Sequence, residues 1–592
     1  MKYIFEGIGI TTAALRKKKE RVFRLFFFFC SLHFLIVNFY FSKALLAQQE
    51  AQQEAQQELK DFDYWASLCD LLKNEKKYAE ALAACDQAIA LNPKEAVTWT
   101  NRIESLLQLK KYTEALVSAD QALKLKSEYS LAWADRCQAL SELGRYEEAI
   151  ASCDRALRGD GDWGKHSPAV AWYNKGLAKM QLGQNEEAIA SYDRTVEINP
   201  TYSLAWADRC QALSNLSNYE QAIASCDRAL RSDGNWEKGT PAVAWYNRGE
   251  ILRKLGRYEE AIASYDRALA INPNDATTWT NHGAVLGLLR KNAEAVTSHE
   301  WAIKISPNYS LALANQCETL NRLGKAEDAL ASCDKALQGD GKWDGASPAL
   351  AWDQRGNALA RQGKYEEALA SHDRAIALKP DYPEAWNNRS VTLWYMGRYE
   401  EALAASDRAI TINPDYSQGW YNRGRILKTL KRYPEAVVAY DRALKSFSNL
   451  GDNLALADIW ANRSAVLWHL QRYPEALAST DSAINLNSNS FQAWYNRGIV
   501  LAELGRYEEA LTAYDRAIRI NPKDANVLAA QGVALIKLKR LQEALIALEQ
   551  ALKIDPNNTL AKQKQEVVMQ QLEQQKKDNP IPVPPLPPPP PS

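Results

Sequence analysis

Eight of the nine cysteines in this chain of 592 residues stand in four pairs, and the two members of each pair are 16 positions apart. Paired thiols suit zinc binding, redox exchange or disulfide crosslinking. Zinc sites and dithiol redox centres use short Cys-x2-Cys spacings, and the sequence has none. We therefore expect no metal and no cofactor at these cysteines. The pairs are Cys69 with Cys85, Cys137 with Cys153, Cys210 with Cys226 and Cys317 with Cys333.

The elements that carry the cysteines belong to a repeat. Tryptophans recur every 34 residues, with three longer steps of 39 residues and one of 40. That register gives fourteen copies from about residue 62 to residue 558, with Leu313 and Leu528 in place of the tryptophan in two of them. A fixed period of this length is typical of a repeat array. The tryptophans are Trp65, Trp99, Trp133, Trp172, Trp206, Trp245, Trp279, Trp352, Trp386, Trp420, Trp460 and Trp494.

A clean copy reads "AVAWYNRGEILRKLGRYEEAIASYDRALAINP", residues 242–273. When the tryptophan is numbered position 4, apolar or small residues recur at positions 4, 8, 11, 20, 24 and 27. This is helical spacing on two segments, with "LGRYEE" as the turn between them and Asn-Pro ending the second helix. The pattern resembles the tetratricopeptide repeat (TPR) family over some five hundred residues. The resemblance implies an all-α fold, a right-handed superhelical solenoid of helix-turn-helix repeats.

Position 7 departs from the family pattern, because this chain usually has arginine where the family usually has leucine. Arg136, Arg248 and Arg497 are examples. We expect these arginines to pair with the acidic residues of "YDRA" on the second helix, in a structural role.

The cysteines occupy positions 8 and 24 of their repeats, and the other copies show how these two positions vary together. Glycine at position 8 goes with a large residue at position 24, as in Gly249 with Tyr265, whereas Ile103 goes with Ala119. Summed volume is roughly held, as expected of two side chains that share one packing site. The two cysteines of a pair are therefore predicted to touch. They form a disulfide in an oxidising compartment, or a reduced core pair otherwise.

Three of the longer steps insert five residues between repeats, in "GDGDWGKHSP", "SDGNWEKGTP" and "GDGKWDGASP". Asp-Gly-Asp is found in calcium loops, but such a loop needs more oxygen ligands and a late bidentate glutamate, which are absent. We interpret the insertions as longer turns closed by proline.

The N-terminus has a basic stretch, "RKKKER", followed by the apolar "LFFFFCSLHFLIVNFYF" and then "SKALLA", which ends at Ala47. This order predicts that residues 1–47 are a secretory signal peptide or an N-terminal membrane anchor. Either one places the repeats outside the cytoplasm, so we expect an exported protein: periplasmic, secreted or membrane-anchored. Residues 48–61 are a predicted helical linker rich in Gln and Glu.

The C-terminal end of the repeats continues into a polar helical stretch. Residues 559–579 are a predicted capping helix, and residues 580–592, "PIPVPPLPPPPPS", are a predicted proline-rich disordered tail. The predicted solenoid itself spans residues 62–558.

Catalysis has no candidate residues. The sequence shows no nucleophile constellation, phosphate loop or metal cluster, and His299 and His372 fall at core position 24. Lys+Arg and Asp+Glu are equal at 72 each, so no net charge attracts nucleic acid. We expect a protein that is not an enzyme and binds neither cofactor, metal nor nucleic acid.

Position 6 is the candidate binding position, because in TPR proteins this side of the first helix lines the groove. The resemblance implies a ladder of side-chain amides that brackets the backbone of an extended peptide. The alternative is that these amides bond neighbouring repeats to one another. Tyr173, Tyr246, Tyr421 and Tyr495 add aromatic contacts there or pack internally. The position-6 residues are Asn101, Asn174, Asn247, Asn281, Asn315, Asn388, Asn422, Asn462 and Asn496, with Asp135 and Asp208 in two copies.

Taken with the export signal, these features predict a non-catalytic scaffold or adaptor that binds an extended protein segment in the groove, at the cell envelope. Two alternatives remain open: an assembly factor for envelope polysaccharide, with sugar in the groove, and a cytoplasmic TPR adaptor with reduced thiols.

Overall fold

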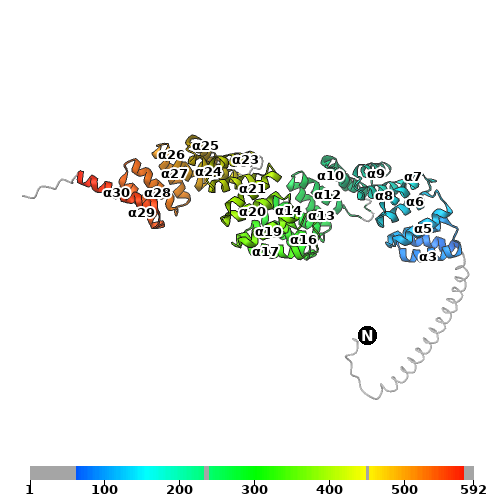
Figure 1. Cartoon of the computed structure of the whole chain (residues 1–592). Helices are drawn as coiled ribbons and strands as arrows, with labels where there is room; N and C mark the ends of the chain where they lie inside the picture. The colour runs from blue at the N-terminus through cyan, green and yellow to red at the C-terminus, as the bar shows by residue number, and fades with distance from the viewer. Residues whose placement is uncertain (1–61, 233–235, 237–238, 448–452, 579–592) are drawn as a thin grey trace, which may run out of the picture. The chain divides into compact units, whose positions relative to one another are not determined.

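The computed structural model describes residues 62–232, 236, 239–447 and 453–578, and all regular structure in these residues is α-helix (Figure 1). The chain divides after Asn272 into two compact units, here called unit 1 and unit 2, and each is described by itself. The helices of unit 1 are α2 (Phe62–Asn74), α3 (Tyr78–Leu91), α4 (Ala96–Gln108), α5 (Tyr112–Leu125), α6 (Ser130–Glu142), α7 (Tyr146–Arg158), α8 (Pro168–Gln181), α9 (Asn185–Ile198), α10 (Ser203–Asn215), α11 (Tyr219–Arg231), α12 (Pro241–Lys254) and α13 (Tyr258–Ile271).

Unit 2 continues the same alternation of paired helices. Its helices are α14 (Ala276–Leu288), α15 (Asn292–Ile305), α16 (Ser310–Arg322), α17 (Ala326–Gln338), α18 (Ala349–Arg361), α19 (Tyr365–Leu378), α20 (Pro383–Tyr395), α21 (Tyr399–Ile412), α22 (Ser417–Thr429), α23 (Tyr433–Phe447), α24 (Asn453–His469), α25 (Tyr473–Leu486), α26 (Phe491–Glu503), α27 (Tyr507–Ile520), α28 (Ala525–Lys537), α29 (Leu541–Ile554) and α30 (Thr559–Asp578).

Each repeat is one pair of packed helices, called here its first and second helix. Helices α2 to α29 make fourteen such pairs in series, six in unit 1 and eight in unit 2, and α30 follows. The all-α class and the serial packing of helix pairs are confirmed. The right-handed twist stays an implication of the family resemblance.

The turn within each repeat needs one residue in the left-handed conformation. Gly144 takes φ +74° there, and its neighbour Arg145 donates its backbone N–H to the Leu140 carbonyl at 2.9 Å, which caps the end of α6. In repeats without glycine, other residues adopt the same conformation, as Lys110 does at φ 59°. The "LGRYEE" turn is therefore set by its hydrogen bonds as well as by glycine.

The predicted contact between positions 8 and 24 is confirmed. A Cβ added to Gly249 would lie 2.6 Å from the ring of Tyr265, and one added to Gly356 would lie 2.5 Å from the ring of His372. The tyrosine and histidine rings at position 24 are fully buried in both repeats. Glycine at position 8 is therefore the space into which the facing ring packs.

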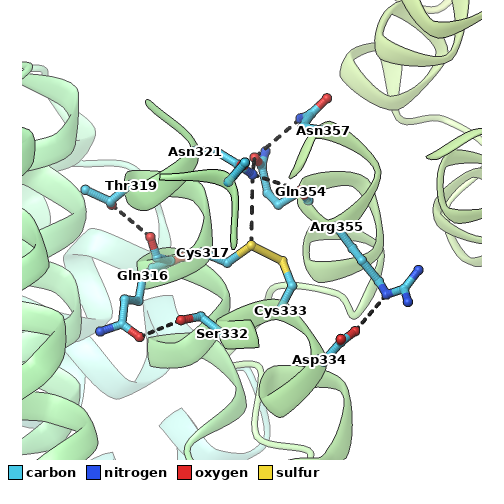
Figure 2. The surroundings of a disulfide bond; sticks show 12 residues. Gln316, Cys317, Thr319, Asn321, Ser332, Cys333, Asp334, Gln354, Arg355 and Asn357 are labelled. Atoms are coloured by element: carbon cyan, nitrogen blue, oxygen red, sulfur yellow. Dashed lines mark hydrogen bonds and ion pairs between the residues drawn. A yellow bond between two sulfur atoms is a disulfide. The ribbon is translucent and has the colours of Figure 1, made fainter. Parts of the chain in front are cut away.

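The cysteines fill the same packing site, with the two sulfurs at covalent distance in each pair. The Sγ atoms of Cys317 and Cys333 lie 2.07 Å apart, between the first and second helices of their repeat (Figure 2). The amide of Asn321 lies 4.0 Å from the Cys317 sulfur and donates to the backbone carbonyl of Gln354 in the next repeat. All eight paired cysteines are fully buried.

The arginines at position 7 form ion pairs with second helices, as predicted, and the partner belongs to the preceding repeat. Arg136 contacts Asp120 of α5 at 2.9 Å and donates to Ser152 of its own repeat at 2.7 Å. Its guanidinium also lies over the ring of Trp133, with 5.6 Å to the centroid. Arg248 repeats the arrangement with Asp227 and Ser264. Each such arginine therefore joins two repeats.

Two of the three inserted turns, those after α7 and α17, cap the repeat that precedes them. Asp160 accepts from the backbone N–H of Ser130 at 3.1 Å, at the start of α6, and from that of Asp162 at 2.9 Å. Asp340 does the same for Ser310 and Lys342. These carboxylates hold a helix N-terminus, which supports their interpretation as structural turns.

The predicted signal or anchor (1–47), linker (48–61) and proline-rich tail (580–592) lie outside the described residues. Among the helices that the structure describes, none is both long and apolar enough to cross a membrane.

Candidate functional site

A cavity of about 920 Å³ opens on the first-helix side of unit 1, across repeats 1 to 3. Helices α2 and α4 form its walls, and the inserted turn after α7 brings Lys165 and His166 to it. Asn101 of the predicted amide ladder lines this cavity, whereas its other polar residues were not predicted.

A charge network occupies the cavity. Lys73 on α2 donates to the Oδ1 of Asn101 at 2.7 Å and contacts two carboxylates, Asp70 at 3.2 Å and Glu104 at 3.0 Å. Burial opposes a charged lysine, but Glu104 and Asp70 raise the pKa of Lys73 above its usual value. His166 approaches Glu104 at 3.8 Å from the inserted turn. Two carboxylates, Asp70 and Glu104, therefore balance the charge of Lys73 within the protein.

Asp135, the position-6 residue of repeat 3, titrates abnormally beside this network. Desolvation raises its pKa to about 7, with Glu104 adding to the rise and His166 and Lys73 opposing it. Asp208 in repeat 5 is shifted the same way, to a pKa of about 6, again by desolvation, while the hydroxyl of Tyr173 donates to it at 2.7 Å and lowers the pKa.

Several amides of the predicted ladder face the preceding repeat. The amide of Asn422 donates to the Oδ1 of Asn387 at 2.8 Å, and that of Asn496 donates to the Ala461 carbonyl at 2.8 Å. Asn247 makes a longer contact to the Ala207 carbonyl, and Asn388 donates to Asp353. Asn174, Asn247, Asn422 and Asn496 are at most 6% exposed. These contacts match the alternative that position 6 joins neighbouring repeats.

The other position-6 amides remain half-buried, which leaves part of each side chain accessible. They are Asn101, Asn281, Asn315, Asn388 and Asn462. The neighbouring tyrosines pack inward against the residue at position 24, as Tyr246 does on Tyr265 with ring centroids 6.2 Å apart. The peptide-binding role of the ladder stays a prediction.

Unit 2 presents a different surface at the same positions, across repeats 10 to 12. Arg425 on α22 lies over Trp394 of α20, 4.8 Å from the ring centroid, and over Tyr421 at 5.8 Å. The indole Nε1 of Trp394 donates to Thr429 at 3.0 Å. The guanidinium therefore rests on aromatic rings instead of on a carboxylate.

Lys428, one turn further along α22, donates to the Oδ1 of Asn462 at 2.7 Å. Burial, and then repulsion by Arg425, lower the pKa of Lys428 below its usual value. In the described part of the chain, no carboxylate lies within ion-pair distance of Lys428 or Arg425. Burial raises the pKa of Tyr421, Arg425 opposes the rise, and Asp458 on α24 adds to it.

A smaller cavity of about 170 Å³ lies beside this cationic region, on α24 and α26. Its walls include Ala465, Trp468 and His469 together with two aliphatic residues of α26, Ile499 and Val500. The Nε1 of Trp468 is buried with no hydrogen-bond partner in the structure. Lys428 contributes, after burial, to the lowered pKa of His469, one of the residues that line this cavity.

None of the side chains that carry this charge was singled out from the sequence. Lys73, Glu104, Arg425 and Lys428 stand at positions 9 and 12, which vary from copy to copy, and the copy-to-copy comparison of those positions is the signal that could have found them. His166 is present in only one of the three inserted turns. Among the described residues, no cluster of three or more His, Cys, Asp or Glu side chains is arranged to hold a metal ion.

Family comparisons agree with the repeat. Models described as Tetratricopeptide repeat or TPR repeat together match more than half of the chain, whereas one described as Protein prenyltransferase alpha subunit repeat matches only residues 473–504. A search of curated proteins found no match. The tetratricopeptide matches are residues 66–130, 106–171, 169–202, 242–275, 356–397, 391–451, 491–524 and 525–558.

Two solved structures align with this chain at low TM-scores. The hetero-tetramer Cut9-Hcn1 of the APC/C aligns with a TM-score of 0.46 at 15% identity, over 87% of this chain and 98% of that chain. YrrB, described as a TPR protein with an unusual peptide-binding site, aligns with a TM-score of 0.28 at 24% identity, over 33% of this chain and 97% of that one.

Proposed function

Because the chain belongs to the tetratricopeptide repeat family, we propose that it is a protein-interaction adaptor that holds an extended segment of a partner along its first-helix face. The observation that carries the proposal is the cavity of about 920 Å³ across repeats 1 to 3, where polar side chains of successive first helices gather. An extended chain crossing it would meet Asp70 on α2 and then Asn101 and Glu104 on α4. Polar side chains from successive first helices suit a peptide backbone, whose amide groups both donate and accept.

The half-buried amides, not the buried ones, would contact the partner. Asn101 and Asn462 each accept from a lysine through Oδ1. Asn422 and Asn496 are committed to the preceding repeat, so they would hold the groove in shape. The ladder thus divides into contact residues and spacers between repeats.

The adaptor would act outside the cytoplasm, with its four cysteine pairs oxidised. The placement of every paired sulfur at covalent distance supports this, as does the predicted export signal. A non-catalytic role is supported by the continuity of the repeat. The segment that matches the prenyltransferase repeat covers α25 and α26, which are ordinary members of the helix series.

Photo-crosslinking in the producing cell tests the adaptor. A photoreactive amino acid replaces Ser67 in the unit 1 cavity, Val391 on α20, or, as a control, the 58% exposed Val438 on α23. We expect light-dependent adducts to polypeptide from the first two positions and none from the third. Adducts to polysaccharide from Ser67 and Val391, equal yields at all three positions, or no adducts would overturn the proposal.

A further inference from the structure

We propose that the first-helix face of repeats 10 to 12 binds an acidic segment of a polypeptide through Arg425 and Lys428. This inference rests on the proposed adaptor function and names the chemistry of one partner segment. The surface, called here the cationic patch, consists of Trp394 on α20, Arg425 and Lys428 on α22, and Trp468 and His469 on α24.

Two lysines occupy the same position in two different repeats. Lys73 and Lys428 are both at position 12, and each donates at 2.7 Å to the Oδ1 of the position-6 asparagine of the next repeat. The repeat therefore gives the two lysine side chains the same orientation. The charged residues around Lys73 and Lys428 differ.

The difference lies at position 9 of the two flanking repeats. Around Lys73 these positions are Asp70 and Glu104, both within ion-pair distance of its Nζ. Around Lys428 they are Arg425 and Ala465, a second cation and a methyl group. Lys73 is neutralised inside the protein, and Lys428 is not.

Partly buried cations without a counter-charge are costly, and an anion supplied from outside would relieve that cost. Burial and the neighbouring Arg425 disfavour the charged form of Lys428, and burial, Lys428 and Lys431 disfavour that of His469. A carboxylate between Arg425 and Lys428 would reverse the balance.

Arg425 is already oriented for such a ligand. Its guanidinium is held against the rings of Trp394 and Tyr421, and its contact to Asn422 at 3.5 Å engages one nitrogen. A guanidinium has five N–H donors in a rigid fork that matches a carboxylate. Because the aromatic rings restrict its motion, little side-chain entropy is lost on binding.

The cavity of about 170 Å³ on α24 and α26 favours a polypeptide as the acidic ligand. Its Ala465, Ile499 and Val500 walls suit an apolar side chain. An acidic peptide offers a carboxylate and an apolar side chain within a few residues. A polyuronate or a nucleic acid offers charge but no apolar side chain.

Fluorescence anisotropy with the full chain tests the inference, using a dye-labelled peptide of alternating Glu and Leu as the probe. Lys428→Met removes the cation, and Ala465→Glu supplies the carboxylate that Glu104 gives Lys73. We expect both variants to weaken binding at least tenfold. Ala465→Gln, which adds bulk without charge, and Lys73→Met, at the matched position of unit 1, should bind within about twofold of wild type. Thermal unfolding of each variant checks that it is folded.

Four results would overturn the inference. The first is that wild type binds the Glu-Leu peptide no better than a Lys-Leu peptide. The second is that Ala465→Gln weakens binding as much as Ala465→Glu, and the third is that Lys73→Met weakens it as much as Lys428→Met. The fourth is that polygalacturonate or phosphatidylglycerol vesicles bind more tightly than the peptide, with the same dependence on Lys428. If polypeptide adducts form at Ser67 and Val391 while the acidic peptide does not bind, the adaptor stands and the cationic patch fails. If no polypeptide adducts form, the adaptor itself fails.

Discussion

Lys73 in unit 1 and Lys428 in unit 2 make the same hydrogen bond to the next repeat, at 2.7 Å in both cases, in opposite electrostatic settings. Two carboxylates raise the pKa of Lys73 against the effect of burial, whereas burial and Arg425 lower that of Lys428. The repeat fixes the direction of the lysine side chain at position 12. The residues at position 9 determine whether that lysine is paired with a carboxylate of the protein or can bind an anionic ligand. Binding chemistry in this solenoid can therefore change from repeat to repeat without a change of fold.

The two units also differ in how they fill the site between positions 8 and 24. Unit 1 has cysteine pairs in three of its six repeats, and unit 2 in one of eight. Most other repeats place glycine against a large residue there, as in Gly498 with Tyr514. Unit 1 thus carries both the neutralised charge network and most of the proposed crosslinks.

Reduction should affect unit 1 most. Each crosslink closes a loop of 16 residues, for which the chain-entropy model gives up to about 3 kcal/mol. Hydrogen exchange of the oxidised and the reduced protein should show large losses of protection in α2, α3, α6, α7, α10 and α11, and in unit 2 only around α16 and α17. Equal losses in both units, or eight thiols that react before reduction, would contradict the proposed bridges.

Glu104→Gln should destabilise unit 1 by about 2 kcal/mol. It leaves Lys73 with Asp70 as its remaining carboxylate and removes the carboxylate that His166 approaches. Thermal unfolding followed by circular dichroism measures the effect. The double variant Lys73→Met plus Glu104→Gln should lose less than the sum of the single variants, since each single variant strands a partner. Strict additivity would show that the network is not coupled.

Asn422→Ala should cost about 1–2 kcal/mol of stability, because the buried Oδ1 of Asn387 loses its donor. Its effect on binding of the Glu-Leu peptide should be within about twofold. Asn462→Ala should do the reverse, with a smaller stability loss and weaker binding, because Asn462 is half-buried and orients Lys428. If Asn422→Ala abolishes binding in a folded protein, the buried amides belong to the contact ladder.

Asp135→Asn should flatten the pH dependence of the stability of unit 1, by up to about 4 kcal/mol. The ordinary aspartate pKa is 3.8 and that of Asp135 is about 7. Between these values the folded state binds more protons than the unfolded state, so this group makes stability fall as pH rises through that window. Asparagine does not titrate, so the variant should gain stability over wild type at pH 7.5 and not at pH 4. A gain that is the same at both pH values would rule out this titration.

The frame of the molecule was predictable because it repeats fourteen times. Covariation of Gly249 with Tyr265 and of the cysteine pairs revealed a contact, and Arg136 could be paired with an acidic second helix. The charge pattern of the candidate sites was not predictable in the same way. Lys73 and Glu104 are 31 residues apart and meet only because successive first helices pack side by side. A consensus of the fourteen copies shows the positions that they share and not positions 9 and 12, at which they differ.

The inserted turn after α7 was predicted as a turn but not as part of a site. Its Asp160 accepts from the backbone N–H of Ser130 at the start of α6, 30 residues away, and Lys165 reaches back to Asp70 of α2 at 3.2 Å. Contacts over such sequence distances depend on how the repeats stack. For the same reason, the division of the amide ladder into buried and accessible members could not be read from nine identical asparagines.

Carbodiimide coupling tests the central claim most directly, because it joins a lysine amine to a carboxylate only where the two are in contact. The full chain is treated with the Glu-Leu peptide present, and the adducts are mapped by mass spectrometry. We predict that the peptide couples to Lys428 and that Lys73 couples instead to Glu104 or Asp70 within the chain. Peptide adducts on Lys73, or on other surface lysines without Lys428, would contradict the division of the two units into a neutralised and an anion-binding face.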